Sequence, residues 1–264
     1  MASLLLALAC ATPTLQQRAE SGEPDAQVAL AERLEKGAPA EAEGGPDASE
    51  LDGEAKRDPD PAQALVWYQR AADQGDARAE LKLAEWYYAG EAGLAVDYAE
   101  CERWARRAAE RGYAPAESFM GGLYRLGAGV PQDYAESVRW YRLAAESGDA
   151  PAQFFMGAAY DFGSGVEPNP KEALRWYELA ANQGWGPAQR NAGLLYLQDD
   201  PAMRDEVRAF MWLVLAAASG DSDADRLVQQ MITRLTPQQI SQAGALVAEY
   251  REAHGLPARE VAAD

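Results

Sequence analysis

The chain of 264 residues carries 42 acidic and 24 basic side chains, which gives it a formal net charge of −18. Nucleic acid is therefore not an expected partner, because contacts with phosphates require a surplus of lysine and arginine. With one histidine and two cysteines, a metal site of ordinary His/Cys spacing is excluded, and a Ser–His–Asp triad would depend on His254. The sequence contains no P-loop and no dinucleotide-binding fingerprint, so we expect neither a cofactor nor a catalytic activity.

The chain begins with an apolar run, residues 4–10, that is too short to span a bilayer. Ala7 and Ala9 match the small residues before a signal-peptidase site and loosely match a lipoprotein box, and both interpretations cut the chain before Cys10. We expect residues 1–10 to act as a signal, with the protein exported to the periplasm or lipid-anchored through Cys10. The first basic residue is Arg18, so the usual basic start of a signal is missing, which a start codon placed too late would explain. The alternative is an ordinary apolar segment of a cytoplasmic protein.

Residues 38–59 form a segment of different composition. They are rich in Glu, Asp, Gly, Pro and Ala and contain almost no apolar side chain whose burial could offset the entropy lost on ordering. We expect a flexible acidic insertion, most simply a solvated loop. An acidic arm that binds a partner is the alternative.

A tryptophan recurs along the rest of the chain at a nearly fixed interval. Trp104, Trp140, Trp176 and Trp212 are 36 residues apart, and Trp67 lies 37 residues before Trp104. Each is followed by an Ala-Ala pair and then a glycine. A period of this size is the signature of a solenoid, in which each repeat buries its apolar face against the next. A binding scaffold is therefore the expected function, and the tryptophans are expected in its core.

One repeat, residues 116–148, indicates how each is built. Ala116 and Met120 begin an apolar stripe at helical spacing. The loop 127–132, Gly-Ala-Gly-Val-Pro-Gln, interrupts it, because glycine permits a sharp reversal and proline ends helical propagation. A second helix follows Asp133. The sequence therefore predicts helix–loop–helix repeats, and no stretch alternates as a strand would.

Helix-capping residues mark the start of each second helix. Seven residues before each tryptophan stands an N-cap residue: Asp60, Asp97, Asp133, Asn169 and Asp205. Three residues after the first four of these stand Gln63, Glu100, Glu136 and Glu172, whereas Arg208 follows the fifth. We therefore predict five N-caps, four of them completed as capping boxes.

Small residues recur at fixed positions of the repeat. Gly121, Gly157 and Gly193 share one position inside the first helix, where glycine costs about 1 kcal/mol relative to alanine. Close approach of the paired helix is the expected reason. Cys101 occupies a position held elsewhere by alanine or serine, so we predict a packing residue rather than a reactive thiol.

The pattern Ala-x3-Leu/Met-Gly-x2-Tyr-x2-Gly-x-Gly-Val…Asp…Ala-x2-Trp-Tyr-x2-Ala-Ala-x2-Gly resembles the Sel-1-like repeat, a relative of the tetratricopeptide repeat. Residues 116–148 and 152–184 match best, and 79–112 and 188–220 match less well. The last of these has Gln-Asp-Asp-Pro at 198–201 in place of the loop glycines, so we expect a different loop there. A divergent first repeat begins near Ala26. The resemblance implies an all-α fold, an α/α superhelix of about five to six repeats over residues 11–255.

The resemblance also implies a function in protein–protein interaction, often in bacterial exported or membrane-associated adaptors. Members of a cysteine-rich branch carry a cysteine pair in each repeat and have been labelled β-lactamases. No such pair exists here, which puts that hydrolase activity in doubt. A cell-envelope protein that contacts peptidoglycan is a further alternative. The expected partner is a protein or a peptide, and the oligomeric state is left open.

The C-terminal residues are expected to close the repeat array. Two helices are predicted within residues 223–253, the second with Thr236 as N-cap, Pro237 at the first position and Gln239 as capping-box partner. Solenoids need such a cap because the last repeat would otherwise expose its core. We expect His254 to cap the last helix or face solvent, and residues 256–264 to be disordered.

The predicted binding groove lies on the first helix of each repeat, opposite the packing stripe. In the related tetratricopeptide fold this face lines the concave groove, and its residues vary here from repeat to repeat, as expected where side chains select a ligand. The candidate groove residues are Leu81, Glu85, Tyr88, Ser118, Arg125, Phe154, Asp161, Arg190, Leu194 and Leu197. Tyr88 and Phe154 are the expected aromatic anchors. Arg125, Asp161 and Arg190 would set the charge preference. The alternative is an ordinary solvated helix face.

Overall fold

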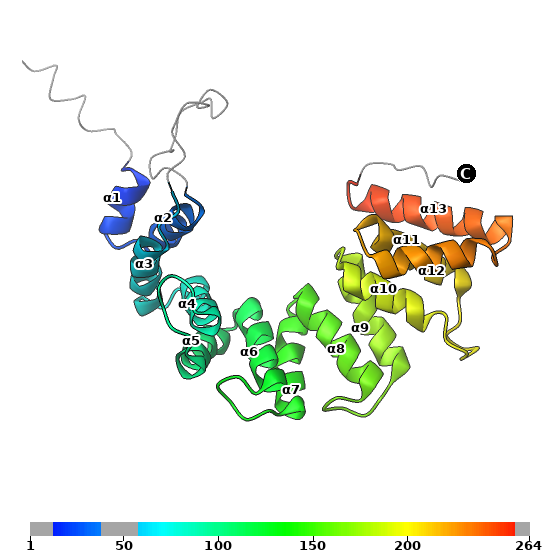
Figure 1. Ribbon diagram of the computed structural model, residues 1–264, viewed down its shortest axis with the longest axis horizontal. Coiled ribbons are helices and arrows are strands. Elements are labelled where there is room, and N and C mark those ends of the chain that lie inside the picture. The colour runs from blue at the N-terminus through cyan, green and yellow to red at the C-terminus, as the bar shows by residue number, and fades with distance from the viewer. Residues whose placement is uncertain (1–12, 38–57, 257–264) are drawn as a thin grey trace, which may run out of the picture. The chain divides into compact units, whose positions relative to one another are not determined.

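The computed structural model describes residues 13–37 and 58–256. Within these ranges the chain is entirely α-helical, with thirteen helices and no strand (Figure 1). The apolar segment with Cys10, nearly all of the insertion and most of the C-terminal tail lie outside the described residues. The chain divides into two compact units, which we call the N-terminal half, up to Gln132, and the C-terminal half, from Asp133 onward.

Consecutive helices pack in pairs within each half. The N-terminal half contains α1 (Leu15–Glu20), α2 (Pro24–Lys36), α3 (Pro61–Asp73), α4 (Ala77–Ala89), α5 (Tyr98–Glu110) and α6 (Ala114–Leu126). The C-terminal half contains α7 (Tyr134–Glu146), α8 (Ala150–Phe162), α9 (Pro170–Asn182), α10 (Gly186–Leu195), α11 (Glu206–Ala218), α12 (Ser222–Ile232) and α13 (Pro237–Ala253). This confirms the predicted all-α repeat solenoid. The even-numbered helices from α2 to α12 are the first helices of the repeats.

All five predicted N-caps are confirmed. The side chains of Asp60, Asp97, Asp133, Asn169 and Asp205 each accept a backbone N–H from the first turn of the helix that follows. The predicted capping boxes are wrong at these helices. The backbone N–H of Asp97 is already donated to the carbonyl of Tyr87, and that of Asn169 to the carbonyl of Tyr160.

The acidic residues expected in those boxes form ion pairs instead. Glu100, Glu136 and Glu172 pair with Arg103, Arg139 and Arg175, each three residues further on. An arginine at this spacing on a helix face is a stronger partner for a carboxylate than a neutral amide that is already bonded. The one predicted box that forms is at α13, where Thr236 and Gln239 bond each other reciprocally.

The repeat tryptophans contribute unequally to the core. Trp104, Trp176 and Trp212 are buried, whereas Trp67 and Trp140 are partly exposed. Arginines cover several of the rings: Arg103 and Arg107 lie over Trp104, and Arg175 lies over Trp176. The side chains excluded most completely from solvent include residues that lie one or two positions from these tryptophans in the sequence, namely Tyr68, Tyr177 and Phe210.

The recurring helical glycines allow close packing of paired helices, as predicted. A Cβ atom at Gly157 would lie 2.5 Å from the ring of Tyr177, and one at Gly193 would lie 2.8 Å from Leu213. Loop glycines have a second role. Gly165 adopts a positive φ and lies so close to the carbonyl of Tyr134 that no Cβ atom would fit. The loop therefore packs directly on the start of the preceding second helix.

A set of buried polar side chains was not predicted. One position of the first helix holds Gln27, Glu80, Glu117, Gln153 and Gln189, all of them buried. The amides of Gln153 and Gln189 donate to the carbonyls of Ala145 and Ala181, at the end of the preceding second helix. Each of these carbonyls also accepts a backbone N–H, from Gly148 or Gly184, so the glutamine amide is an additional bond that links neighbouring repeats and fixes their register.

Two helices, α12 and α13, occupy the region predicted to close the array, and α13 packs against α11. The hydroxyl of Tyr250 donates to the carbonyl of Ala181 at 3.0 Å. The ring of His254 stacks on Tyr250 with centroids 4.0 Å apart, and its nitrogens each lie 2.6 Å from a backbone carbonyl, those of Tyr250 and Asn182. The single histidine thus fastens α13 to the end of α9, and it is the C-cap residue of α13.

Candidate partner-binding face

The predicted groove residues lie on the first helices of four repeats. In the N-terminal half, α4 carries Leu81, Glu85 and Tyr88, and α6 carries Ser118 and Arg125. In the C-terminal half, α8 carries Phe154 and Asp161, α10 carries Arg190 and Leu194, and Leu197 follows α10.

A cavity of about 200 Å³ opens on this face in the N-terminal half, and we call it the N-terminal cavity. It is bounded by α2, α3, α4 and the residue that precedes α6. Its lining consists of Val28, Glu32, Tyr68, Arg78, Leu81, Lys82, Glu85 and Tyr113. Two of the predicted groove residues, Leu81 and Glu85, therefore share a cavity with residues from three other elements.

Charged groups around this cavity are tightly interlinked. Lys82 lies 3.1 Å from the carboxylate of Glu35 and 3.6 Å from that of Glu85. The hydroxyl of Tyr68 donates to Glu35 at 3.1 Å. Burial raises the pKa of Glu85, with Lys82 opposing the shift and the neighbouring carboxylate of Glu35 adding to it. The negative charge of Glu85 is thus only partly balanced by the positive charge of Lys82.

Arg78 forms the other cationic site at this cavity. Its guanidinium pairs with Asp76 at 2.6 Å and with Asp25 at 2.5 Å. Asp76 also caps α4 through the backbone N–H groups of Arg78 and Ala79. Burial raises the pKa of Tyr113, as do the nearby carboxylates of Asp76 and Glu85, while Arg78 lowers it. Two carboxylates thus already hold the guanidinium of Arg78.

The remaining predicted residues of the N-terminal half lie beside aromatic side chains or at the surface. Tyr88 packs edge-on against Tyr98 and Phe119, with ring centroids 5.5 Å and 5.9 Å apart. It thereby joins α4, α5 and α6 while remaining partly exposed. Ser118 and Arg125 are half-buried on α6. An anchoring role for Tyr88 stays a prediction.

In the C-terminal half, several predicted residues already have internal partners. Phe154 contacts the rings of Phe155 and Tyr177. Asp161 accepts a hydrogen bond of 3.5 Å from Tyr177, and burial raises the pKa of Asp161. Arg190 pairs with Asp221 at 2.8 Å and with Asp223 at 3.7 Å. Leu194 is exposed.

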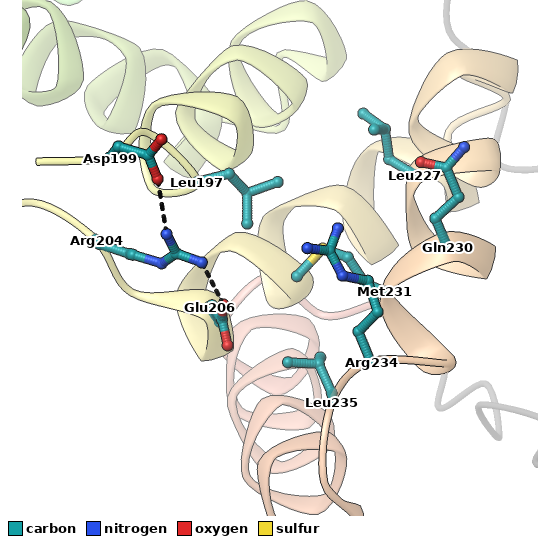
Figure 2. A pocket seen from close by; sticks show the side chains of 9 residues that line it. All are labelled: Leu197, Asp199, Arg204, Glu206, Leu227, Gln230, Met231, Arg234 and Leu235. Atoms are coloured by element: carbon teal, nitrogen blue, oxygen red, sulfur yellow. Dashed lines mark hydrogen bonds and ion pairs between the residues drawn. The ribbon is translucent and has the colours of Figure 1, made fainter.

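A second cavity, of about 430 Å³, lies where α10 ends, between the start of α11 and α12, and we call it the C-terminal cavity (Figure 2). Its lining consists of Leu197, Asp199, Arg204, Glu206, Leu227, Gln230, Met231, Arg234 and Leu235. Of these only Leu197 was predicted. The others come from the loop after α10, from the start of α11, and from α12 and the residues that follow it.

The loop with Gln-Asp-Asp-Pro at 198–201 shapes this cavity. It differs from the glycine loops, as predicted: α10 ends early at Leu195, and the carbonyl of Asp200 accepts the N–H groups of Met203 and Arg204. Arg204 lies between Asp199 and Glu206, 2.8 Å from each carboxylate, as the dashed lines in Figure 2 show. Arg234 lies on the other side and has no ion pair with another described residue.

The described residues offer little chemistry of other kinds. Cys101 is buried, and burial raises the pKa of its thiol to about 12, which suits a packing residue and not a nucleophile. No group of three or more potential metal-ligating side chains occurs in the part of the chain that the structure describes. Among those same residues, no helix is both long enough and apolar enough to cross a membrane.

These features define a class of proteins built from helix–loop–helix repeats that share packing positions and differ on the face of their first helices. The model of the Sel1 repeat family matches residues 48–76, 77–113, 114–149, 150–185 and 186–221. The chain therefore belongs to the Sel1 repeat family. No curated protein is similar enough in sequence to be matched.

Solved structures of Sel1 repeat proteins resemble this chain over most of its length. A protective antigen of uropathogenic Escherichia coli with the same repeat fold is 29% identical, with a TM-score of 0.74 over 95% of this chain and 52% of the antigen. A Sel1 repeat protein from Oxalobacter formigenes is 30% identical, with a TM-score of 0.69 over 82% of this chain and 57% of that one. This chain thus spans little more than half the length of either protein. A Sel1 repeat protein from Klebsiella pneumoniae, 22% identical with a TM-score of 0.50 over 82% of this chain and 96% of its own, shares the fold.

Proposed function

We propose that this protein is a non-catalytic scaffold that binds a protein or peptide partner on the face formed by the first helices of its repeats. The observation that carries the proposal is that each half has a cavity lined in part by residues predicted on this face. Leu81 and Glu85 line the N-terminal cavity, and Leu197 lines the C-terminal cavity together with residues before α11 and after α12. Cavities with apolar walls and a few charged groups are typical anchor sites for partner side chains.

The distribution of residues along the repeats supports the same proposal. Positions that pack against a neighbouring helix hold alanine or glycine in repeat after repeat, as at Ala79, Ala116, Ala152 and Ala188. The face of the first helices instead carries leucine, serine, phenylalanine or arginine at one aligned position, Leu81, Ser118, Phe154 and Arg190. A regular scaffold with a variable face separates the residues for folding from those for recognition.

The proposal includes a location in the bacterial cell envelope. It is supported by the apolar segment that ends before Cys10 and by the antigenic role stated for the Escherichia coli protein with the same repeats. Export to the periplasm, with or without a lipid on Cys10, is the proposed route. A cytoplasmic location is the alternative, and separation of cells into periplasmic, membrane and cytoplasmic fractions distinguishes the two.

Site-specific photo-crosslinking tests the binding face directly. A photoreactive amino acid would replace Ser118 in one variant and Leu194 in another, both on first helices. Arg139, a highly exposed residue on the second helix α7, provides the control position. We expect one and the same partner to crosslink from the first-helix positions and not from Arg139. Crosslinking from Arg139 alone would move the binding surface to the second helices and contradict the proposal.

A further inference from the structure

The N-terminal cavity has more carboxylates than cations. Arg78 is held by Asp76 and Asp25, and Lys82 lies closer to Glu35 than to Glu85. Glu32, at the rim, has no ion pair with another described residue. The cations of the cavity are therefore already engaged, while the carboxylates of Glu32 and Glu85 retain capacity for a further positive charge.

The walls of the cavity suit a long aliphatic chain that ends in a cation. Val28 and Leu81 provide apolar surface, and the partly exposed Tyr113 provides an aromatic ring, whereas Tyr68 is buried behind them. Lysine and arginine side chains bury their methylene stems against apolar surface while the charged end remains beside polar groups. Aromatic rings attract such cations through their negative faces. A volume of about 200 Å³ accommodates one side chain and not a whole folded domain.

We propose that the N-terminal cavity binds a lysine or arginine side chain from a basic segment of the partner, with the cation between the carboxylates of Glu32 and Glu85. The inference rests on the proposed scaffold function and specifies the chemistry of its partner. The net charge of −18 attracts basic segments and repels acidic ones before contact is made. The raised pKa of Glu85 is consistent with a carboxylate that lacks a full cationic partner in the free protein.

The C-terminal cavity has the opposite arrangement and provides an internal comparison. Its two carboxylates, Asp199 and Glu206, are both paired with Arg204, and Arg234 adds an unpaired cation. No carboxylate remains there for a ligand cation. Preference for a basic side chain is therefore a property of the N-terminal cavity and not of the whole binding face.

Short synthetic peptides test this recognition. Fluorescein-labelled peptides of glycine, serine and alanine would carry one central residue, either lysine, the uncharged analogue norleucine, or glutamate, and binding would be followed by fluorescence anisotropy. We expect the lysine peptide to bind about tenfold more tightly than the norleucine peptide, the size of effect typical of a partly desolvated charge contact. Raising the salt from about 0.05 M to about 0.5 M should reduce this preference.

Matched variants assign the effect to the cavity. Glu32→Gln combined with Glu85→Gln should abolish the preference for lysine over norleucine and leave the norleucine affinity unchanged. Glu146→Gln combined with Glu249→Gln removes the same charge from exposed positions of the C-terminal half and should retain the preference. Circular dichroism would verify that both variants keep the helical content of the parent.

Two results would overturn the inference. Equal affinities for the lysine and norleucine peptides in the parent protein, including no measurable binding of either, would mean that the cavity does not recognise a cation. An equal loss of preference in both double variants would mean that overall charge, rather than the cavity, attracts the peptide. In either case, continued photo-crosslinking from Ser118 and Leu194 would leave the scaffold function standing, so the two proposals fail separately.

Discussion

Glu80 and Arg107 form an ion pair of 2.9 Å even though the side chain of Glu80 is completely excluded from solvent. A second arginine, Arg111, lies 3.3 Å from the other carboxylate oxygen. In other repeats the corresponding pair is neutral: Gln74 donates to Gln27, and Gln183 donates to Gln153, both at 2.8 Å. One structural position thus accepts either an amide pair or a carboxylate with two arginines.

The first prediction concerns this exchange. Glu80→Gln should lower the free energy of unfolding by about 2 kcal/mol, because it removes the buried charge that the two arginines face, although both remain partly in water. The triple variant Glu80→Gln, Arg107→Leu, Arg111→Gln carries the residues that another repeat has at the corresponding positions, Gln153, Leu179 and Gln183. It should recover most of this lost stability. Urea unfolding followed by circular dichroism measures both. A triple variant less stable than the single variant would show that the two arrangements are not interchangeable.

The second prediction concerns the glycines inside helices. Gly157→Ala should lower the free energy of unfolding by about 1–3 kcal/mol, because its new methyl group would overlap the ring of Tyr177. Gly244, inside α13, is the matched control, since nothing lies within 4 Å of a Cβ atom there. Gly244→Ala should stabilise the protein by about 0.5–1 kcal/mol through helix propensity. Thermal unfolding of the two variants tests the contrast, and similar shifts of the two melting temperatures would contradict it.

Features that depend only on residues close together in the chain were predicted correctly, whereas several features that depend on contacts with another helix were not. The N-caps depend on a side chain and the next turn of its own helix, so Asp97 and Asn169 were identified correctly. The capping boxes were wrong because the competing acceptors, the carbonyls of Tyr87 and Tyr160, belong to a different helix. Burial of Glu80 could not be predicted for the same reason, since a polar residue on a helix face is ordinarily solvated.

The candidate binding face was predicted in part. The alignment of repeats identified Leu81 and Leu197, which both line cavities, because the face of a helix follows from its periodicity. Glu32 occupies the position of α2 that aligns with Glu85 and was missed because the divergent first repeat was not included in the alignment. Tyr113 and Arg234 could not be identified, because they reach the cavities from the ends of helices. Ion-pair partners within the protein, such as Asp221 for Arg190, could not be predicted either, because they depend on the packing of the next repeat.

The third prediction concerns pH. Burial alone would raise the pKa of Asp76, but its hydrogen bonds from Arg78 and from the backbone of α4 hold that pKa below its ordinary value of 3.8. The carboxylate of Asp76 is therefore protonated less readily in the folded state than in the unfolded state. The stabilisation that ionised Asp76 contributes is fully present above about pH 4 and is lost as the pH falls through its folded-state pKa. Asp76→Asn should cost a few tenths to about 1 kcal/mol at pH 7, and the difference from the parent should shrink toward pH 3.

Urea unfolding at a series of pH values measures this difference. Asp149→Asn is the control, because Asp149 caps α8 through the N–H of Ala152 but has no ion pair with another described residue. The loss of unfolding free energy should depend on pH more strongly for Asp76→Asn than for Asp149→Asn. A difference between parent and Asp76→Asn that grows as the pH falls would have the wrong sign and would exclude the ion pair with Arg78 as its cause.

The last prediction concerns the acidic insertion. The backbone N–H of Asp60 donates to the carbonyl of Leu34 at 2.9 Å, so the two ends of the segment lie together, as Asn169 and Tyr160 do around the glycine loop of another repeat. Replacing residues 38–59 by Ala-Gly-Val-Pro-Gln, which is the sequence of 128–132, should therefore keep α2 and α3 paired. The entropy of loop closure changes only slowly with length, so the melting temperature should stay the same or rise slightly. A shortened protein that loses helix content would mean that the insertion contributes packing to α2 and α3, whereas one that folds but fails to crosslink its partner from Ser118 would assign the insertion to binding.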